Sequence, residues 1–230
     1  MRKINGFTII EPGDEFPDPA QGPTNNPLAF GRDLTAALML KAYHKGIFAW
    51  SDDPVSWWSP DPRAIIGLND LYVSKSLARK IRKQTFRVTI DFAFEGVVAG
   101  CATPRYTGDE TWISPEFHAC FRRLHYSGYA HSIECWQDNH LAGGVFGVAV
   151  GGLFSAESMF HQVTDASKVA LYYLVETLKQ AQFSLLDIQV LTPHTSSLGA
   201  KSISRHDYLH LLAEALKTPV LALSRQVIVD

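Results

Sequence analysis

Three strand-like segments separated by very short turns lie in the middle of the chain, at residues 131–136, 141–150 and 153–159. The turns contain Asp138-Asn139 and Gly151-Gly152, residue types that accept the unusual backbone angles of a tight hairpin. Connections this short join antiparallel neighbours, because a parallel crossover needs about a dozen residues or more. The pattern therefore predicts a three-stranded antiparallel meander around which the rest of the chain must fold.

Helices are expected before and after this meander along the chain. Ser114 followed by a proline is a strong helix start, since serine caps free backbone N–H groups and proline fits the first turn. Asp165 and Ser204 are expected to cap two further helices, and residues 185–191 form another predicted strand. Strands and helices follow one another irregularly, which is typical of the α+β class with a mainly antiparallel sheet.

The N-terminal part is marked off by its prolines. Five of them fall between residues 12 and 27, a density that excludes a continuous helix or a central strand, so this stretch should wrap over a surface. Two more flank Asp61 and suggest a boundary. We expect a small N-terminal domain at residues 1–63 and a larger domain at residues 64–230.

Composition and cysteine usage point to a cytoplasmic protein. The formal net charge of −2 gives no global reason to expect a nucleic-acid partner, so such a partner must be argued from local clusters. The N-terminal residues lack the apolar core of a signal peptide, and no run approaches the roughly 20 apolar residues of a membrane span. Three cysteines are an odd number without close pairing, which suits a reducing compartment.

One local cluster is strongly basic. In residues 74–83 the apolar side chains fall on one side of a helical wheel and the basic ones on the other, and no acid occurs between Asp70 and Asp91. A solvated helix face explains such a charge run, and so does a surface that binds the phosphates of a nucleic acid. The basic residues are Lys75, Arg79, Lys80, Arg82 and Lys83.

Three polar residues interrupt two otherwise apolar strands. Glu157 lies in the third strand of the meander, and Asp187 and Gln189 lie two apart in the later strand, so the latter pair should share a face. Charges in buried strands are costly unless paired or used. If the two strands are neighbours, these residues form one cleft in which an acid can polarise an amine or take its proton. Ordinary structural hydrogen bonding remains the alternative.

Tryptophans and histidines are further candidates for a site. Most tryptophans belong to a core, but Trp50 and Trp112 each stand at the edge of an element, where an exposed ring can stack on a base. His206 and His210 have the spacing of a helical metal pair, but the sequence suggests no third ligand nearby. We therefore expect no metal site.

The chain resembles the bacterial leucyl/phenylalanyl-tRNA–protein transferases through motifs dispersed over nearly all its length. Each motif alone is weak, but many in the same order are specific. They include AYHKGIF at 42–48, WWSPDPR at 57–63, TWI at 111–113, HSIE at 131–134, ESMF at 157–160, DIQ at 187–189 and SLGA at 197–200.

This resemblance implies an activity. Members move Leu, Phe or Met from aminoacyl-tRNA to proteins with an N-terminal Arg or Lys, which marks those proteins for degradation. The reaction uses no ATP, metal or other cofactor. The resemblance also implies a C-terminal domain similar to the GNAT acetyltransferase fold.

The resemblance also assigns roles to residues. It implies that Trp50 and Trp112 hold the 3′-terminal adenosine, that Glu157 orders the aminoacyl group, and that Asp187 and Gln189 lie at the reacting centre. These last three are the expected catalytic residues. The basic segment 75–83 is expected to face the tRNA. The side-chain pocket is expected to consist of Val145, Phe154, Met159 and Leu171.

Two rival functions remain open on the sequence alone. An acyl-CoA N-acyltransferase shares the implied fold, but it needs a pyrophosphate-binding turn, and residues 165–168 offer no glycine-rich one. A non-catalytic tRNA-binding module is the other rival. Ala156 and Val145 depart from the usual family pattern, so the preference among Leu, Phe and Met stays open.

Overall fold

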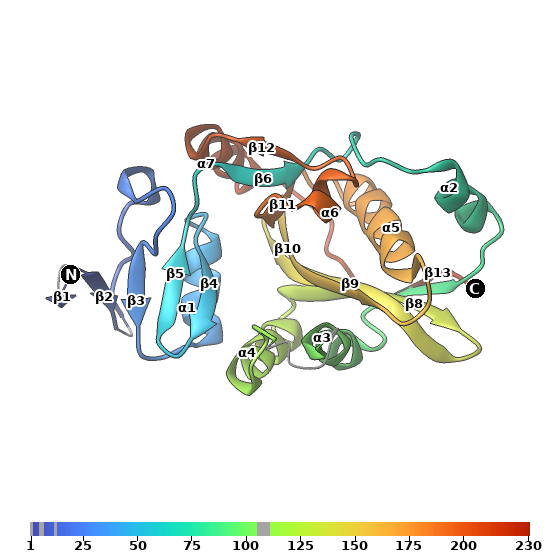
Figure 1. The fold of residues 1–230 in the computed structure, drawn as a ribbon, viewed down its shortest axis with the longest axis horizontal. Helices are drawn as coiled ribbons and strands as arrows, with labels where there is room; N and C mark the ends of the chain where they lie inside the picture. Colours follow the sequence, from blue (N-terminus) through green and yellow to red (C-terminus); the bar gives the residue numbers. More distant parts are fainter. Residues whose placement is uncertain (1, 5–6, 12, 105–110) are drawn as a thin grey trace.

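The protein is described here by a computed structural model that covers residues 2–4, 7–11, 13–104 and 111–230, with two β-sheets (Figure 1). The smaller sheet has the order β1-β2-β3-β5-β4 and the larger one the order β12-β6-β11-β10-β9-β8-β7-β13. The strands of the smaller sheet are β1 (Arg2–Ile4), β2 (Phe7–Ile10), β3 (Ala29–Gly31), β4 (Phe48–Asp52) and β5 (Val55–Trp58). Those of the larger sheet are β6 (Arg63–Ile66), β7 (Arg87–Ile90), β8 (Ala130–Gln137), β9 (His140–Val150), β10 (Leu153–His161), β11 (Leu185–Gln189), β12 (Lys201–Ile203) and β13 (Gln226–Val229).

The predicted meander forms the centre of the larger sheet. Strands β8, β9 and β10 pair in antiparallel fashion along most of their lengths. Strand β11 then pairs with β10 in parallel fashion after a crossover through α5 (Ala166–Gln180). The other pairs in this sheet are antiparallel. The α+β class with a mainly antiparallel sheet is therefore confirmed.

Helices cover both faces of the larger sheet (Figure 1). Helix α5 packs against β8, β9 and β10 on one face, and α3 and α4 pack against the other. Helix α1 contacts α4 and thereby joins the smaller sheet to the larger one. The remaining bounds are α1 (Ala36–Tyr43), α2 (Lys75–Arg82), α3 (Phe94–Ala102), α4 (Pro115–Tyr126), α6 (Pro193–Ser196), α7 (Arg205–Ala215) and the 3₁₀ helix η1 (Pro19–Gln21).

Most helix starts follow the sequence prediction. Ser114 and Ser204 cap α4 and α7 through their side-chain oxygens, as expected. Asp165 stands at the N-cap of α5, as predicted, but it has a φ of 75° and its side chain makes no capping hydrogen bond. Its carboxylate instead pairs with Lys80 at 2.8 Å and with Lys168 at 3.5 Å. Charge pairing with a distant helix thus prevails over local capping.

A continuous apolar core joins the two sheets. Trp57 of the smaller sheet, Phe117 of α4 and Phe146 of β9 are fully buried members of one cluster. The buried side chain of Arg205 binds the proline-rich stretch to α7. Its guanidinium donates to the carbonyl oxygens of Gly22, Pro23 and Ser59. The division into domains at residues 1–63 and 64–230 remains a prediction. Among the described residues, no helix has the length and apolar character needed to cross a membrane.

Candidate active site

Strands β10 and β11 separate at the point where the predicted polar residues lie. Their parallel pairing runs from Leu153 only as far as Ser155, which is opposite Asp187. There the register of β10 with β9 shifts around Glu157, and the register of β11 with β6 shifts before Gln189. Gln189 adopts a φ of 65° at this irregularity. Bulges of this kind redirect side chains, and here two of them turn an acid and an amide toward each other.

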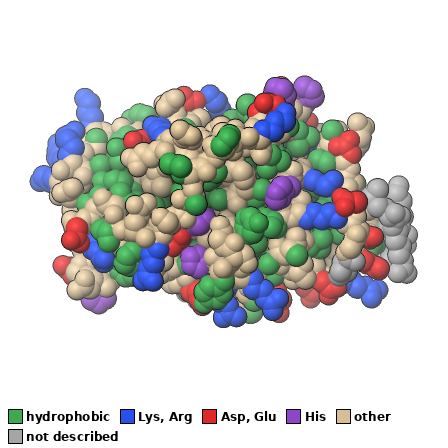
Figure 2. Space-filling model, turned by 180° about the vertical axis from the view of Figure 1, so that it is seen from behind, with side chains coloured by type: hydrophobic (Ala, Val, Ile, Leu, Met, Phe, Trp, Pro, Cys, Tyr) green, Lys and Arg blue, Asp and Glu red, His purple; other side chains and the backbone are tan. Residues whose placement is uncertain are grey.

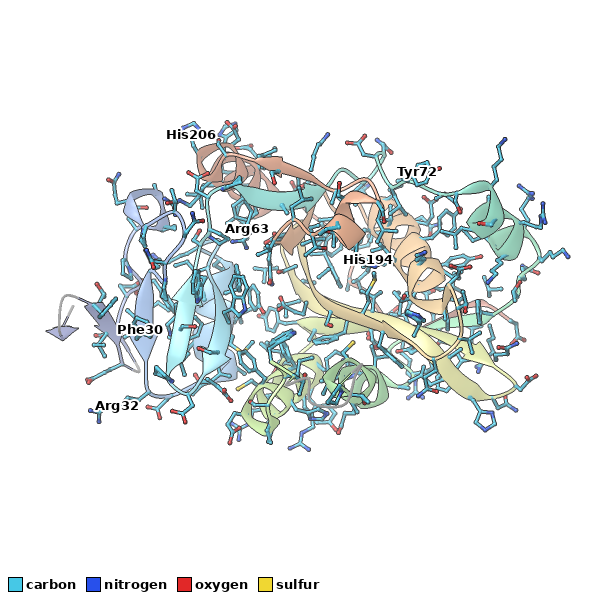
Figure 3. All side chains as sticks on the ribbon, viewed as in Figure 1. Phe30, Arg32, Arg63, Tyr72, His194 and His206 are labelled. Atoms are coloured by element: carbon cyan, nitrogen blue, oxygen red, sulfur yellow. The ribbon has the colours of Figure 1, made fainter. Side chains whose placement is uncertain are left out.

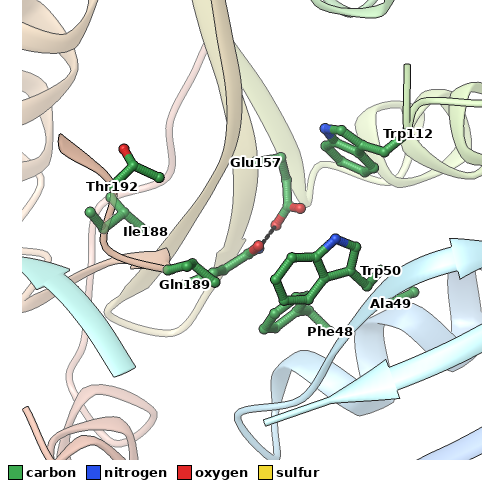
Figure 4. A pocket seen from close by; sticks show the side chains of 9 residues that line it. Phe48, Ala49, Trp50, Trp112, Glu157, Ile188, Gln189 and Thr192 are labelled. Carbon is green, nitrogen blue, oxygen red and sulfur yellow. Dashed lines mark hydrogen bonds between the residues drawn. The ribbon is translucent and has the colours of Figure 1, made fainter. Parts of the chain in front are cut away.

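Glu157 is the centre of the resulting hydrogen-bond network. Its Oε1 accepts a bond from Nε2 of Gln189 at 2.9 Å (Figure 4). It also accepts bonds from the hydroxyl of Tyr43 at 2.9 Å and from the hydroxyl of Ser155 at 3.1 Å. Burial raises the pKa of this carboxyl to about 7, although the three donors oppose the shift. A group that titrates near neutrality is suited to general acid–base chemistry.

Asp187 is engaged in a different way. It is 1% exposed, and Nε and Nη2 of Arg63 donate to its two oxygens at 2.9 and 2.6 Å. The hydroxyl of Tyr208 and the main-chain N–H of Gln189 add bonds of 2.8 Å each. Asp187 therefore contacts Gln189 through the backbone and not through the side-chain amide. Both carboxylate oxygens are filled, which leaves Asp187 poorly placed to take a proton.

Sequence reasoning missed four residues around these two acids: Tyr43 and Ser155 at Glu157, and Arg63 and Tyr208 at Asp187. Arg63 is 1% exposed and lies between the two sheets (Figure 3). Its guanidinium lies over the rings of Phe48 and Tyr208, 4.8 and 4.4 Å from their centroids. An arginine that opens an otherwise apolar strand was the available signal, because a buried guanidinium requires an anionic partner. Tyr43 gave no signal, since an aromatic residue on the inner face of a helix is ordinary.

An aromatic cavity of about 280 Å³ opens beside Glu157 and Gln189. Trp50 and Trp112, the two predicted stacking residues, both line it, and their indoles face the Glu157–Gln189 pair (Figure 4). Trp50 is 42% exposed, so its ring is accessible to a ligand. The complete lining is Phe48, Ala49, Trp50, Trp112, Glu157, Ile188, Gln189, Val190 and Thr192.

A second, mainly apolar cavity of about 180 Å³ lies on the other side of Glu157 and Ile188, which line both cavities. Of the predicted pocket residues, the structure brings together Val145, Met159 and Leu171. Phe154 does not line this cavity: it is 1% exposed and packed in the core below it. The lining is Ile66, Val145, Ala156, Glu157, Ser158, Met159, Leu171, Ile188, His194, Thr195 and Leu198.

The five predicted basic residues lie together on and just after α2. Figure 2 shows the resulting gathering of Lys and Arg side chains at the end of the molecule where α2 lies. Lys80 differs from the others, because its Nζ binds Asp165 at 2.8 Å and the carbonyl of Thr164 at 3.1 Å. Within the described part of the chain, the other four side chains form no ion pair. They are Lys75, Arg79, Arg82 and Lys83.

The geometry as a whole fits a ligand with two unlike ends. The aromatic cavity suits a flat ring system, the apolar cavity suits an aliphatic or aromatic side chain, and the carboxyl and amide of Glu157 and Gln189 stand where the two meet. No group of three or more His, Cys, Asp or Glu side chains among the described residues is arranged to hold a metal. The described side chains of the site supply hydrogen bonds and, in Glu157, a carboxyl with a pKa of about 7.

Comparison with known proteins identifies relatives over most of the chain. A family model described as leucyl/phenylalanyl-tRNA protein transferase matches residues 65–213, and a model of that family's N-terminal domain matches residues 32–61. A leucyl/phenylalanyl-tRNA–protein transferase from Shewanella pealeana is 50% identical over 86% of this chain and 86% of its own length. The one from Shewanella halifaxensis is 49% identical over 92% of this chain and 91% of its own length.

Similarity to solved structures is more remote. A GCN5-related N-acetyltransferase from Kribbella flavida matches with a TM-score of 0.38 and 12% sequence identity. The match covers 63% of this chain and 55% of that chain. A likeness of this size supports no conclusion about activity.

Proposed function

Because this chain belongs to the leucyl/phenylalanyl-tRNA protein transferase family, we propose that it transfers Leu, Phe or Met from aminoacyl-tRNA to the α-amino group of proteins that begin with Arg or Lys. The chain is an aminoacyltransferase whose substrates are an aminoacyl-tRNA and a protein acceptor. We propose in addition that this transfer marks the acceptor proteins as N-degrons and that the protein acts in the cytoplasm.

The reaction is the aminolysis of an ester. The acceptor's α-amine attacks the carbonyl carbon of the aminoacyl group, and a C–N bond forms as the C–O bond to the terminal ribose breaks. The amine loses a proton and the leaving ribose oxygen gains one, so the step is balanced without any further reactant. Since the ester already carries the activation, the protein has to position two substrates and stabilise the charge that develops.

The observation that carries the proposal is the pair of unlike cavities with Glu157 and Ile188 as their shared wall. In this proposal the 3′-terminal adenosine stacks against Trp50 and Trp112 in the aromatic cavity. The amino-acid side chain occupies the apolar cavity beside Val145, Met159 and Leu171, with Phe154 supporting it from the core. The ester that joins the two parts then lies beside Glu157 and Gln189.

Within this arrangement Glu157 is the favoured proton acceptor. A pKa near 7 leaves much of the carboxyl ionised at neutral pH, and its Oε2 accepts no hydrogen bond from a described residue. Gln189 orients the reacting groups, because a neutral amide cannot take the proton. We assign Asp187 a positioning role: it fixes the main chain of Gln189 while Arg63 and Tyr208 hold its carboxylate.

The basic helix provides the proposed contact with the tRNA body. Clustered Lys and Arg side chains gain affinity for a nucleic acid through counterion release. The exposed side chains of Lys75, Arg79, Arg82 and Lys83 are available for this contact. Lys80 adds to the local potential while it also anchors the helix through Asp165.

A transfer assay tests the proposal directly. The protein is mixed with tRNA charged with labelled Leu, Phe or Met and with a peptide that begins with Arg, without ATP. Labelled peptide is the expected product, and an otherwise identical peptide that begins with Glu serves as the negative acceptor. Failure to label the Arg peptide would overturn the proposal. Acetyl transfer from acetyl-CoA without tRNA would favour the acyl-CoA alternative, and tRNA binding without any transfer would favour the binding module.

A further inference from the structure

The two indoles that line the aromatic cavity are carried by separate parts of the fold. Trp50 belongs to β4 of the smaller sheet, whereas Trp112 lies just before α4, which packs on the larger sheet. If both indoles stack on one flat ligand, the distance between the two rings must stay fixed. Something in the structure must therefore hold β4 and the start of α4 in register.

Each ring packs against aromatic neighbours in its own part of the fold. The ring of Trp58 packs against Trp50 at 5.0 Å, and the indole N–H of Trp58 donates to Ser56 Oγ at 2.9 Å. On the other side, Trp112 packs edge-on against Phe117 of α4, with ring centroids 5.2 Å apart. These contacts fix Trp50 relative to β5 and Trp112 relative to α4, and neither joins one indole to the other.

Asp52 and Ser114 connect the two elements directly. Asp52 lies two residues after Trp50, and Ser114 lies two residues after Trp112. The hydroxyl of Ser114 donates to Oδ2 of Asp52 and accepts a bond from the N–H of Phe117 at 3.2 Å. The N–H of Ser114 also donates to the carbonyl of Trp112 at 3.1 Å. The carboxylate thus holds the first turn of α4, where a negative charge is also favoured by the helix dipole.

We infer that Asp52 is a positioning residue that sets the separation of Trp50 and Trp112 through Ser114, and thereby the grip on the 3′-terminal adenosine. The inference rests on the proposed function, because it takes the adenosine as the ligand between the indoles. Asp52 itself does not line the aromatic cavity. Its effect on substrate passes through the two rings.

The test compares tRNA with and without its 3′-terminal adenosine. For the wild type, the dissociation constant of the shortened tRNA divided by that of the complete tRNA measures how much the adenosine contributes to binding. Asp52→Ala should lower this ratio at least about fivefold, toward that of Trp50→Ala, because the loss of one stacked base costs about that much or more. Binding of the shortened tRNA and the melting temperature should change little.

Two variants serve as matched controls. Asp52→Asn retains an oxygen that accepts from Ser114, so it should restore most of the ratio. Asp53→Ala removes the neighbouring charge, and Asp53 is exposed and makes no hydrogen bond or ion pair with the described residues, so this variant should behave as wild type. A loss in Asp53→Ala equal to that in Asp52→Ala would assign the effect to charge alone and overturn the inference.

The outcomes separate this inference from the proposed function. If Trp50→Ala and Trp112→Ala lower the ratio but Asp52→Ala leaves it at the wild-type value, the positioning role is wrong while the adenosine site stands. If neither tryptophan variant changes the ratio, the adenosine is not held there, and both the site assignment and the role of Asp52 are wrong.

Discussion

Arg63 and Asp187 form a buried two-point ion pair, with Nε–Oδ1 and Nη2–Oδ2 distances of 2.9 and 2.6 Å, at the junction of the two sheets. The pair links β6 to β11 and, through the carbonyl of Gly46, to the loop after α1. It therefore fixes the strand end from which Gln189 reaches Glu157. Asp187 therefore contributes to the site mainly by holding these strands in place.

Asp187→Ala should destabilise the protein strongly, because it leaves the Arg63 guanidinium buried without a counter-charge. Breaking one side of a buried pair costs about 3–5 kcal/mol, and urea denaturation would measure the loss. A double variant, Arg63→Met with Asp187→Leu, should recover part of this stability, since apolar replacements of similar volume avoid the uncompensated charge. Asp187→Ala with wild-type stability and no transfer activity would instead assign Asp187 a chemical role.

Glu157→Gln should remove from the pH profile of the transfer rate the inflection near pH 7 that Glu157 causes. If ionised Glu157 takes the proton, the wild-type rate rises with pH through about 7 and then levels off. The acceptor amine itself titrates at about 7.7–8.0, so both proteins are assayed with the same peptide and the difference between their profiles is evaluated. An inflection near 7 that persists in Glu157→Gln would remove Glu157 from the proton transfer.

The same carboxyl predicts a pH dependence of stability. The pKa of this carboxyl is about 7 in the folded state, and its ordinary value is 4.5. Between pH 4.5 and pH 7 the folded protein therefore keeps a proton that the unfolded chain releases. Stability from this group is present below pH 4.5 and is lost as the pH rises toward 7. Glu157→Gln lacks this loss and should gain stability relative to wild type from about pH 5 to about pH 8 in urea titrations. A difference that stays constant across this range would contradict the shift.

The fold could be predicted where local patterns decide it. The short turns at Asp138-Asn139 and Gly151-Gly152 dictate the meander, and Ser114 and Ser204 cap their helices as their positions indicate. Asp165 shows where local reasoning fails. The sequence predicts that its side chain caps α5, but its carboxylate pairs instead with Lys80, which lies in a helix about eighty residues earlier.

The site could be predicted in its members but not in its connections. Polar residues in apolar strands are visible in a sequence, so Glu157, Asp187 and Gln189 could be selected. Strand periodicity predicted that Asp187 and Gln189 share a face, but a register shift and a positive φ at Gln189 interrupt the alternation there, and neither is visible in an apolar/polar pattern. The partner of Asp187 is an arginine more than a hundred residues away, and such pairs depend on tertiary packing.

Helix α2 should contribute to tRNA binding through its individual charges. Replacing Arg79, Arg82 or Lys83 by Ala should lower the slope of log affinity against log salt by about 0.7–0.9 for each phosphate that the side chain neutralises. Lys80→Ala should lower it less, because Lys80 Nζ is already bound by Asp165 and Thr164. Lys179→Ala is a suitable control, since it removes a paired charge from another helix. Equal slopes for all these variants would show that α2 is a solvated helix face that does not bind the tRNA.

Substitutions of Val145 and Phe154 should have different effects, the first on the choice between Phe and Leu and the second on the stability of the protein. Val145 lines the cavity, so Val145→Met should narrow it and reduce the transfer of Phe more than that of Leu. A change of this size in an apolar pocket alters discrimination by about 10-fold or more, which the ratio of the kcat/KM values for the two charged tRNAs would report. Phe154 packs below the cavity without lining it, so Phe154→Ala should lower stability by about 3–5 kcal/mol. It should reduce both transfers alike, and a selective effect from Phe154→Ala alone would show that the side chain is bound deeper than the cavity suggests.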